Sequence, residues 1–237
     1  MQALFETKEL KKSTTTMKSF LENYAELREL VSKSKSMTKK EKTDTLNKND
    51  DSLKIMCDSY FNTVLHALLT THPFEIKVKD KEGVEVARDF WNWYQYIPAS
   101  TKYHDTENGG LYHHCQKQFY NWLKSLLQMK CDYPVEKACL ISLAHDFCKT
   151  THYYYDYADN QWHNNYPETY HHATKSLEIA KQIGLDVTPD VEALILMHMS
   201  GYQNLEDKMA MSDDAKKWLF DLDHMQILQL LNCADCK

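Results

Sequence analysis

Residues 135–147 read VEKACLISLAHDF, and this stretch decides the fold expected for the chain. Apolar side chains cover nearly every side of a helix drawn through it, namely Ala138, Leu140, Ile141, Leu143, Ala144 and Phe147. A helix without a polar face must be surrounded by other elements, so we expect a central buried helix. It ends on His145 and Asp146, two polar residues in a position where burial is predicted.

The segment before this helix has a clear helical pattern. Apolar residues three and four positions apart predict a helix over 111–129, namely Leu111, Cys115, Phe119, Trp122, Leu126 and Met129. The chain has only 5 glycines and 5 prolines in 237 residues, too few for the many tight turns of a β-sandwich or barrel. We therefore predict an all-α fold built as a helical bundle.

The segments after the central helix continue the helical pattern. A helix over 168–183 is expected to end at Gly184, a favoured C-cap residue. Thr188 followed by a proline predicts the start of a helix over 189–200. A last helix is expected from about residue 213 to near the C-terminus.

Two short segments depart from the helical pattern. Residues 75–88 alternate weakly around Lys81-Glu82-Gly83, which is compatible with a small β-hairpin. Residues 150–167 contain a tyrosine run and the turn-like pair Asp159-Asn160, so we expect a second short hairpin or an ordered loop. The run Tyr153 to Tyr155 is interpreted as packing rather than as a surface that stacks on bases.

The N-terminal part differs in composition from the rest. Helices are predicted over 15–32 and 52–71, whereas residues 33–51 have almost no apolar groups and are lysine-rich. We expect that stretch to be a solvated linker or mobile loop that could contact an anionic substrate or partner. The predicted organisation is an N-terminal helix plus a Lys-rich linker over 1–51 and a globular domain over 52–237.

Charge limits the classes of partner. The chain has a formal net charge of −6, with 12 basic and 9 acidic side chains over 1–55 but 16 basic and 25 acidic ones beyond. A general basic surface for long nucleic acid is therefore not expected. Arginine occurs only at Arg28 and Arg88, so we expect a bound phosphate to be held by metal, lysine or histidine.

Cysteine usage and hydropathy bear on the compartment. The 7 cysteines show no framework spacing, and the charged start of the chain does not read as a signal peptide. No run approaches the roughly 18 apolar residues that a membrane span requires. We expect a reducing, cytoplasmic setting and no membrane partner.

Polar residues interrupt the apolar stripes at a small number of places. The chain has 12 histidines, and four of them and two aspartates lie where helix cores are predicted: His114, His145, Asp146, His172, His198 and Asp235. A lone histidine on an apolar face is most often a hydrogen-bonded core residue. Buried carboxylates are costly unless paired, however, and convergence on a divalent metal would satisfy all six groups together.

In this order and spacing, these residues resemble the HD-domain superfamily of metal-dependent phosphohydrolases, and most closely the small HD proteins of bacteria and their phages. The similarity covers roughly residues 95–237. The stretches that carry it are Pro98-Ala99-Ser100-Thr101-Lys102-Tyr103-His104, Gly109-Gly110-Leu111-Tyr112-His113-His114, Leu143-Ala144-His145-Asp146-Phe147-Cys148-Lys149, His172-Ala173-Thr174-Lys175-Ser176 and His198-Met199.

The resemblance implies a role for each matching residue. One metal would be bound by His114, His145, Asp146 and Asp235, and a second by Asp146, His172 and His198. Such a set of four histidines and two carboxylates suits two divalent ions of Mn, Fe, Co or Ni better than Mg. His113 and His171 adjoin two of these residues and remain rivals, because a shift by one residue turns a side chain by about 100° around a helix.

Several further residues are candidates for the reaction. Asp146 and Lys149 are the proposed catalytic pair, in which Lys149 either holds a phosphate oxygen or forms a salt bridge to a carboxylate. Ser100, Lys102 and His104 would form a substrate loop over the metals, or a loop that only packs. The CxxC at 233–236 is interpreted as incidental thiols, because a structural zinc site needs further ligands.

The leading functional expectation is hydrolysis of a phosphate ester by a hydroxide activated between two metals. The resemblance makes a nucleotide the first candidate among phosphorylated small molecules. Two other classes stay open, namely a mixed-valent di-iron oxygenase of the same superfamily and a non-catalytic metal-binding sensor or interaction module. The oligomeric state is left open.

Overall fold

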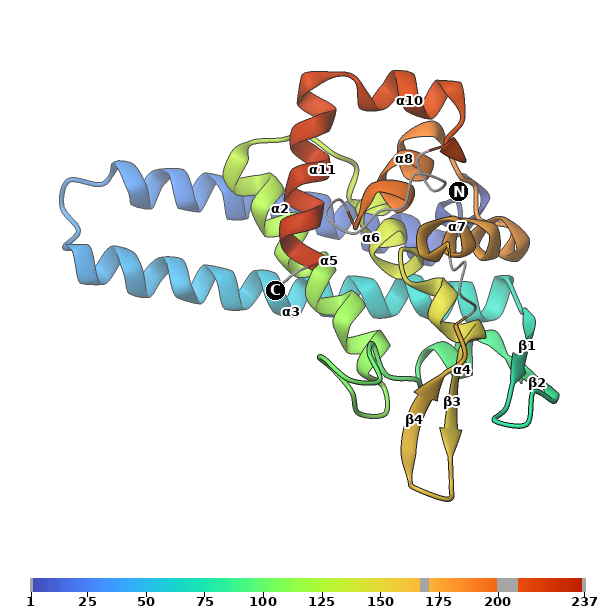
Figure 1. Ribbon diagram of the computed structural model, residues 1–237. Helices are drawn as coiled ribbons and strands as arrows, with labels where there is room; N and C mark the ends of the chain where they lie inside the picture. Colours follow the sequence, from blue (N-terminus) through green and yellow to red (C-terminus); the bar gives the residue numbers. More distant parts are fainter. Residues whose placement is uncertain (1, 167–170, 200–208, 236–237) are drawn as a thin grey trace.

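The computed structural model describes residues 2–166, 171–199 and 209–235 (Figure 1). The described chain is mostly helical, with two antiparallel pairs of strands, as expected for an all-α fold with minor hairpins. None of the described helices is long and apolar enough to cross a membrane. The elements are α1 Gln2–Phe5, α2 Lys8–Lys33, α3 Lys39–Thr71, β1 Glu75–Lys79, β2 Glu85–Asp89, α4 Phe90–Tyr94, α5 Gly110–Met129, α6 Val135–Ala144, the 3₁₀ helix η1 Phe147–Thr151, β3 Tyr153–Asp156, β4 Gln161–Asn164, α7 His172–Ile183, α8 Pro189–Met197, α10 Asp213–Leu219 and α11 Leu222–Asp235.

Helix α6 is the central helix that its sequence predicts. It contacts α2, α5, α7 and α8, and all but two of its residues are buried. The α-helix ends at Ala144, three residues earlier than expected, and His145 forms its C-cap. The chain then tightens into η1, so that Asp146 lies at the turn between the two helices.

Helix α5 packs against both α6 and α11. Gly109, with φ 82°, precedes the helix in a left-handed conformation that favours glycine. At Gly110 an added Cβ would lie 1.9 Å from the carbonyl oxygen of Asp105, so only glycine fits under the loop before the helix. The indole N–H of Trp122 donates to the carbonyl of Ile227 at 3.3 Å, which fixes α11 along α5.

Helices α7 and α8 begin and end close to the predicted positions. Gly184 is the C-cap of α7 with φ 89°, as expected. Thr188 occupies the N-cap position of α8, but its hydroxyl donates to the carboxylate of Asp190 at 2.6 Å rather than capping the backbone. The residues before 171 and after 199 that were expected to extend these helices lie outside the described chain.

The C-terminal part contains two helices instead of the single one expected from residue 213. Helix α10 ends at Leu219 with Phe220 as its C-cap, and α11 begins at Leu222. Between them the carboxylate of Asp221 accepts the backbone N–H of Asp223 at 2.9 Å, which stabilises a turn at this point.

Both expected hairpins are present. Strands β1 and β2 pair with Val78 opposite Val86, and β3 and β4 pair with Tyr155 opposite Trp162. Figure 1 shows both hairpins on the side of the molecule opposite α10. Tyr153 is buried, and Tyr155 packs against Trp162 with ring centroids 5.4 Å apart, so the tyrosine run contributes to packing.

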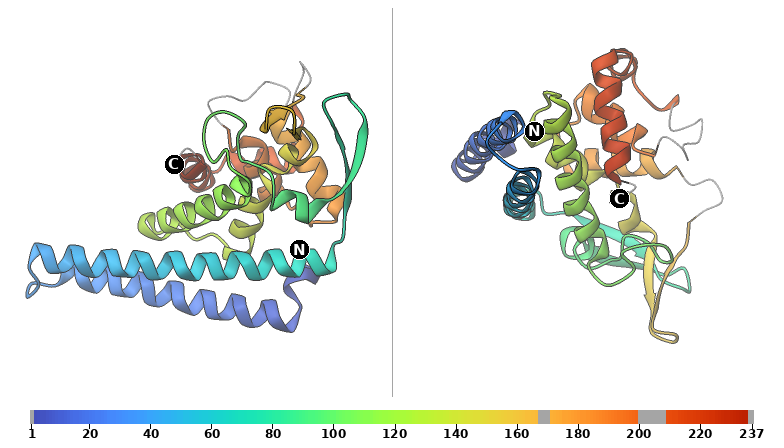
Figure 2. Two further views of the ribbon diagram at one scale, coloured as in Figure 1. Left: turned by 90° about the horizontal axis from the view of Figure 1, so that it is seen from below. Right: turned by 90° about the vertical axis from the view of Figure 1, so that its left-hand side faces the viewer.

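The predicted Lys-rich linker over 33–51 is wrong. Helix α3 begins at Lys39 with a capping box between Thr38 and Glu41 and crosses the expected boundary at residues 51 and 52 without a break. Figure 2 shows α2 and α3 lying side by side and extending beyond the rest of the chain. Polar contacts hold this arm together: the carboxylate of Asp50 accepts hydrogen bonds from Tyr24 and Arg28, each at 2.7 Å. A search for apolar stripes does not detect such pairing.

Candidate metal centre

Six predicted residues from five separate parts of the fold meet beside α6. Two compact groups of donor atoms form, each with its atoms within 4.8 Å of one another. The first group is His114 of α5, His145 at the end of α6 and Asp235 at the end of α11. The second is Asp146 before η1, His172 at the start of α7 and His198 after α8. The structure thus brings together all six residues that the sequence singled out.

In the first group the donor atoms of the three side chains converge. The carboxylate Oδ1 of Asp235 lies 3.1 Å from Nε2 of His114 and 3.2 Å from Nε2 of His145. The two Nε2 atoms are 3.4 Å apart. The side-chain amide of Gln118 donates to the same Oδ1 at 3.2 Å and so orients the carboxylate.

Asp146 connects the two groups. Its Oδ1 lies 2.6 Å from Nε2 of His172 in the second group. Its Oδ2 lies 3.4 Å from Nε2 of His145 and 3.7 Å from Nε2 of His114 in the first group. The same Oδ2 accepts a charge-assisted hydrogen bond from Nζ of Lys149 at 2.5 Å. Each oxygen of this buried carboxylate therefore faces a different group.

The second ring nitrogen of each histidine also has a neighbour. Nδ1 of His145 lies 2.9 Å from the carbonyl of Ser142, and Nδ1 of His198 lies 2.6 Å from the carbonyl of Ile195. A carbonyl can only accept, so both Nδ1 atoms carry a proton. In the neutral rings Nε2 is then available as a ligand, and outer hydrogen bonds of this kind orient histidines in metal sites.

The two remaining histidines each have a side-chain neighbour at Nδ1. Nδ1 of His172 lies 3.2 Å from Sγ of the buried Cys148. Nδ1 of His114 lies 3.8 Å from Oδ2 of Asp105. Neither Cys148 nor Asp105 was predicted from the sequence as part of the site. Each adjoins a singled-out residue, but nothing in its local pattern separates it from an ordinary core or loop residue.

The electrostatics of the cluster are those of two buried carboxylates balanced by cations. Burial would lower the pKa of His145, but Asp146 and Asp235 raise it to about 10. Burial would raise the pKa of Asp146, but Lys149 and His145 hold it well below its ordinary value. For Asp235, burial again works to raise the pKa, and the neighbouring His114 and His145 lower it.

The donor set therefore fits a metal. Imidazole nitrogens and carboxylate oxygens are ligands of first-row divalent metals, and a cation can replace the protons that balance the carboxylates. These buried His and Asp groups can hold a metal ion.

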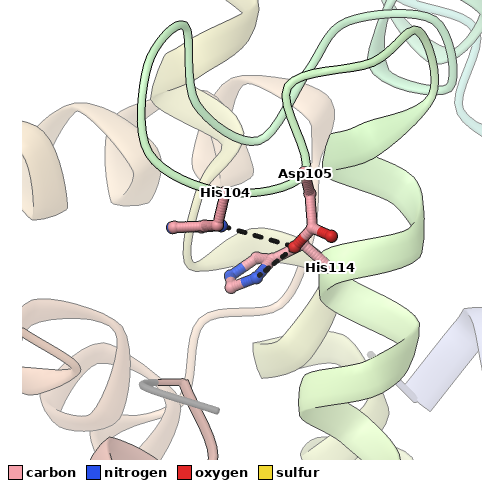
Figure 3. A group of neighbouring side chains, drawn as sticks. All are labelled: His104, Asp105 and His114. Carbon is pink, nitrogen blue, oxygen red and sulfur yellow. Dashed lines mark hydrogen bonds and ion pairs between the residues drawn. The ribbon is translucent and has the colours of Figure 1, made fainter.

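The predicted substrate residues have different places around this cluster. His104 lies next to it: its Nδ1 is 3.3 Å from Oδ2 of Asp105, and its ring centroid is 5.1 Å from that of His114 (Figure 3). Ser100 is buried and accepts the backbone N–H groups of Lys102 and Tyr103, so its hydroxyl shapes the loop. The ammonium of Lys102 lies 5.8 Å from the ring centre of Tyr103.

The rival histidines lie differently. The ring of His113 packs edge-on against Tyr112 with centroids 5.1 Å apart, and His171 is the N-cap residue of α7. Among the described residues, neither belongs to a group that could hold a metal. Cys233 of the CxxC is an exposed free thiol, and Cys236 lies outside the described residues.

Comparisons with family models, with curated proteins and with solved structures find no match to this chain. The case for a function therefore depends on the geometry of the cluster and on the residues that carry the resemblance.

Proposed function

We propose that this chain is an HD-superfamily phosphohydrolase that cleaves a phosphate ester, with a nucleotide as the first candidate substrate. The observation that carries the proposal is the position of Asp146. Its Oδ1 faces His172 at 2.6 Å, and its Oδ2 faces His145 at 3.4 Å. A carboxylate held between two groups of histidines is the arrangement that a shared ligand of two metal ions requires.

In this proposal His114, His145, Asp146 and Asp235 hold one divalent ion, and Asp146, His172 and His198 hold a second. The nitrogen-rich donor set favours Mn, Fe, Co or Ni over Mg. When bound, a pair of such ions supplies an activated water as nucleophile and neutralises charge on the phosphoryl group.

Asp146 and Lys149, the proposed catalytic pair, have different roles: Asp146 would bind metal, and Lys149 would contribute a positive charge. Burial would lower the pKa of Lys149, but the adjacent Asp146 carboxylate raises it, so the ammonium stays charged at neutral pH. A fixed buried cation beside the metals favours an anionic group such as a phosphoryl oxygen. The alternative task of Lys149, a salt bridge to Asp146, is present in the structure at 2.5 Å.

His104 is the candidate for contact with the substrate itself. Its side chain is 53% exposed, whereas that of His114 behind it is 8% exposed, so it lies at the open edge of the cluster. Asp105 orients its ring from the same loop. Lys102 and Ser100 belong to this loop, and we assign to Ser100 the task of shaping it.

The test is a screen of phosphorylated metabolites against protein loaded separately with Mn, Fe, Co and Ni. Hydrolysis by the wild type, lost in Asp146→Ala and kept in His113→Ala, would support the proposal. His113 is a matched control because it is the neighbour of His114 outside the cluster. Oxygen uptake without hydrolysis of any ester would point to the di-iron oxygenase alternative. If the protein binds metal but shows neither hydrolysis nor oxygen uptake, the non-catalytic sensor or interaction module becomes the favoured alternative.

A further inference from the structure

A second concave site lies outside the metal cluster, between the two hairpins. The cleft has a volume of about 480 Å³ and is lined by β1, β2, α4, β3 and the turns that follow β1 and β3. None of its lining residues is among the six of the metal cluster. The metal centre therefore does not account for this cleft.

Aromatic rings form much of the cleft wall. Trp93 of α4 and Tyr96 just after this helix have ring centroids 5.9 Å apart, and Tyr155 and Tyr157 have centroids 5.1 Å apart. Tyr157 is 82% exposed and Tyr96 is 45% exposed, so a part of this aromatic surface is open to solvent. Planar aromatic groups stack on such surfaces.

The cleft also contains an arginine without an acidic partner. The guanidinium of Arg88 lies 5.1 Å from the ring centre of Trp93, and Arg88 has no ion-pair partner among the described residues. The only other arginine of the chain, Arg28, is paired with Asp50 at 2.7 Å. Arg88 follows Val86 at i+2 on the strand, and both line the cleft.

The three acidic residues that line the cleft, Asp80, Glu82 and Asp156, each have another partner, and the carboxylate of Glu82 lies 3.8 Å from Nζ of Lys81. The carboxylate of Asp80 accepts the backbone N–H groups of Glu82 and Val84 in the β1–β2 turn. Asp156 accepts Nζ of Lys81 at 3.2 Å, an ion pair that joins the tips of the two hairpins across the cleft. Arg88 is therefore a cation beside open aromatic faces, and the neighbouring carboxylates do not neutralise it directly.

We propose that this cleft binds an anion that carries a planar aromatic ring, of which a nucleoside monophosphate is the representative, at a site separate from the metal centre. The ring would stack on the open faces of Tyr157 and Tyr96, and the guanidinium of Arg88 would pair with the phosphate, since arginine matches phosphate oxygens with two parallel hydrogen bonds. Lys79, which also lines the cleft, adds a further positive charge.

A hydrogen bond connects the wall of the cleft to η1, the short helix beside the metal centre. The indole N–H of Trp93 donates to the carbonyl of Thr150 at 3.0 Å, and Thr150 lies in η1 next to Lys149. A ligand that contacts Trp93 would therefore touch a residue that is hydrogen-bonded directly to η1, the element that carries Lys149. The proposal concerns binding, and it stands whether or not the metal centre hydrolyses phosphate esters.

The test is isothermal titration of the full-length, metal-free protein with adenosine monophosphate, with adenosine and inorganic phosphate as partial ligands. The nucleotide should bind more tightly than either partial ligand. Arg88→Met should weaken nucleotide binding about tenfold or more, because a lost hydrogen bond to a charged group corresponds to such a factor. Tyr157→Leu should weaken the binding of the nucleotide and of adenosine but not that of phosphate.

Two further variants make the result decisive. Lys77→Met removes a charge from the same hairpin, where Lys77 pairs with Glu85 outside the cleft, and should bind like the wild type. Asp146→Asn alters the metal centre and should also keep nucleotide binding. The proposal is overturned if the nucleotide does not bind, if Arg88→Met and Tyr157→Leu both bind it like the wild type, or if Asp146→Asn abolishes binding.

Discussion

Oδ1 of Asp146 lies 2.6 Å from Nε2 of His172, which joins the turn after α6 to the first residue of α7. A second contact holds the same two elements together: the hydroxyl of Ser176 on α7 accepts the backbone N–H of Cys148 in η1 at 3.1 Å. The central buried helix and its neighbour are therefore held together at the place where the two groups of metal-ligand candidates meet.

The pair of adjacent histidines on α5 gives a direct comparison. His114→Ala should lose at least one bound metal per chain, because its Nε2 faces Asp235 at 3.1 Å. His113→Ala should keep the wild-type metal content, since its ring packs on Tyr112. Elemental analysis of both purified variants measures this, and equal metal content in the two would count against the ligand assignment.

Metal binding should release protons. Burial would lower the pKa of His172, but Cys148 and Asp146 raise it to about 10, and that of His145 is also raised to about 10. A histidine ligand must be neutral, so at pH 7 metal displaces protons from both rings, and affinity should increase with pH. Titration calorimetry in two buffers of different ionisation enthalpy should show release of about two protons per chain. A heat independent of the buffer would be inconsistent with this account.

The same shifts predict how the metal-free protein responds to alkali. A histidine pKa raised by folding contributes stability that is fully present below its unfolded value near ~6.5 and is lost as pH rises through the folded value. The folded values of His145 and His172 are about 10. Thermal unfolding of the metal-free protein should therefore occur at lower temperature at pH 10 than at pH 7. A smaller loss is expected when metal is bound, and an unchanged Tm without metal would contradict the assignment.

Cys148 should affect metal binding through His172, whose Nδ1 lies 3.2 Å from its Sγ. Loss of an outer partner typically weakens metal affinity about 10–100-fold, so Cys148→Ala should bind the second metal more weakly. Cys148→Ser keeps a polar atom at this place and should recover part of the affinity. Competition with a chromophoric chelator measures both, and wild-type affinity of the alanine variant would exclude this role.

Gly110 should be required for the loop that carries His104 and Asp105. A Cβ at Gly110 would lie 1.9 Å from the carbonyl oxygen of Asp105 and 3.0 Å from the backbone nitrogen of Ala99. Gly110→Ala should cost about 1–3 kcal/mol or more and displace the loop, because the clash is with backbone. Gly83→Ala is the comparison: the positive φ of Gly83 strains an alanine there by about 1–2 kcal/mol, but nothing lies within 4 Å of the added Cβ, so no clash is added. Denaturant unfolding compares the two, and a loss of stability at Gly110 no larger than that at Gly83 would refute the steric argument.

Asp190 should stabilise the junction between α6 and α8. Burial would raise its pKa, but hydrogen bonds from Lys137, Thr188 and Tyr133 lower it. Asp190→Asn should lower the free energy of unfolding by about 1–3 kcal/mol at pH 7. A carboxyl pKa lowered by folding contributes stability above its unfolded value of about 3.9, so the difference from the wild type should shrink only as the pH falls below that value. Asp213→Asn, whose side chain is fully exposed, should have little effect.

Much of this architecture was predictable because it depends on apolar periodicity. Helix α6 lacks a polar face, so its burial followed from sequence alone, and polar residues at core positions such as His145 and Asp235 indicated a shared site. Asp105 and Cys148 were not predictable, because their contacts with His114 and His172 depend on how a loop and a 3₁₀ helix place them.

The arm of α2 and α3 shows the opposite case. The start of α3, within residues 39–51, is polar, and the contacts of Asp50 with Tyr24, Arg28 and Lys124 join α3 to α2 and α5. Hydrophobic patterning carries no information about such pairs. For this reason a stretch interpreted as a linker is a helix held by charge and hydrogen bonds.

The central claim is that Asp146 lies between two metal ions. Anomalous diffraction from crystals of the protein grown with Mn or Co, recorded on both sides of the metal absorption edge, tests it most directly. The account predicts two peaks per chain that share Asp146, one bounded by His114, His145 and Asp235 and the other by His172 and His198. No peak at these residues, or a single peak that Asp146 does not contact, would contradict it.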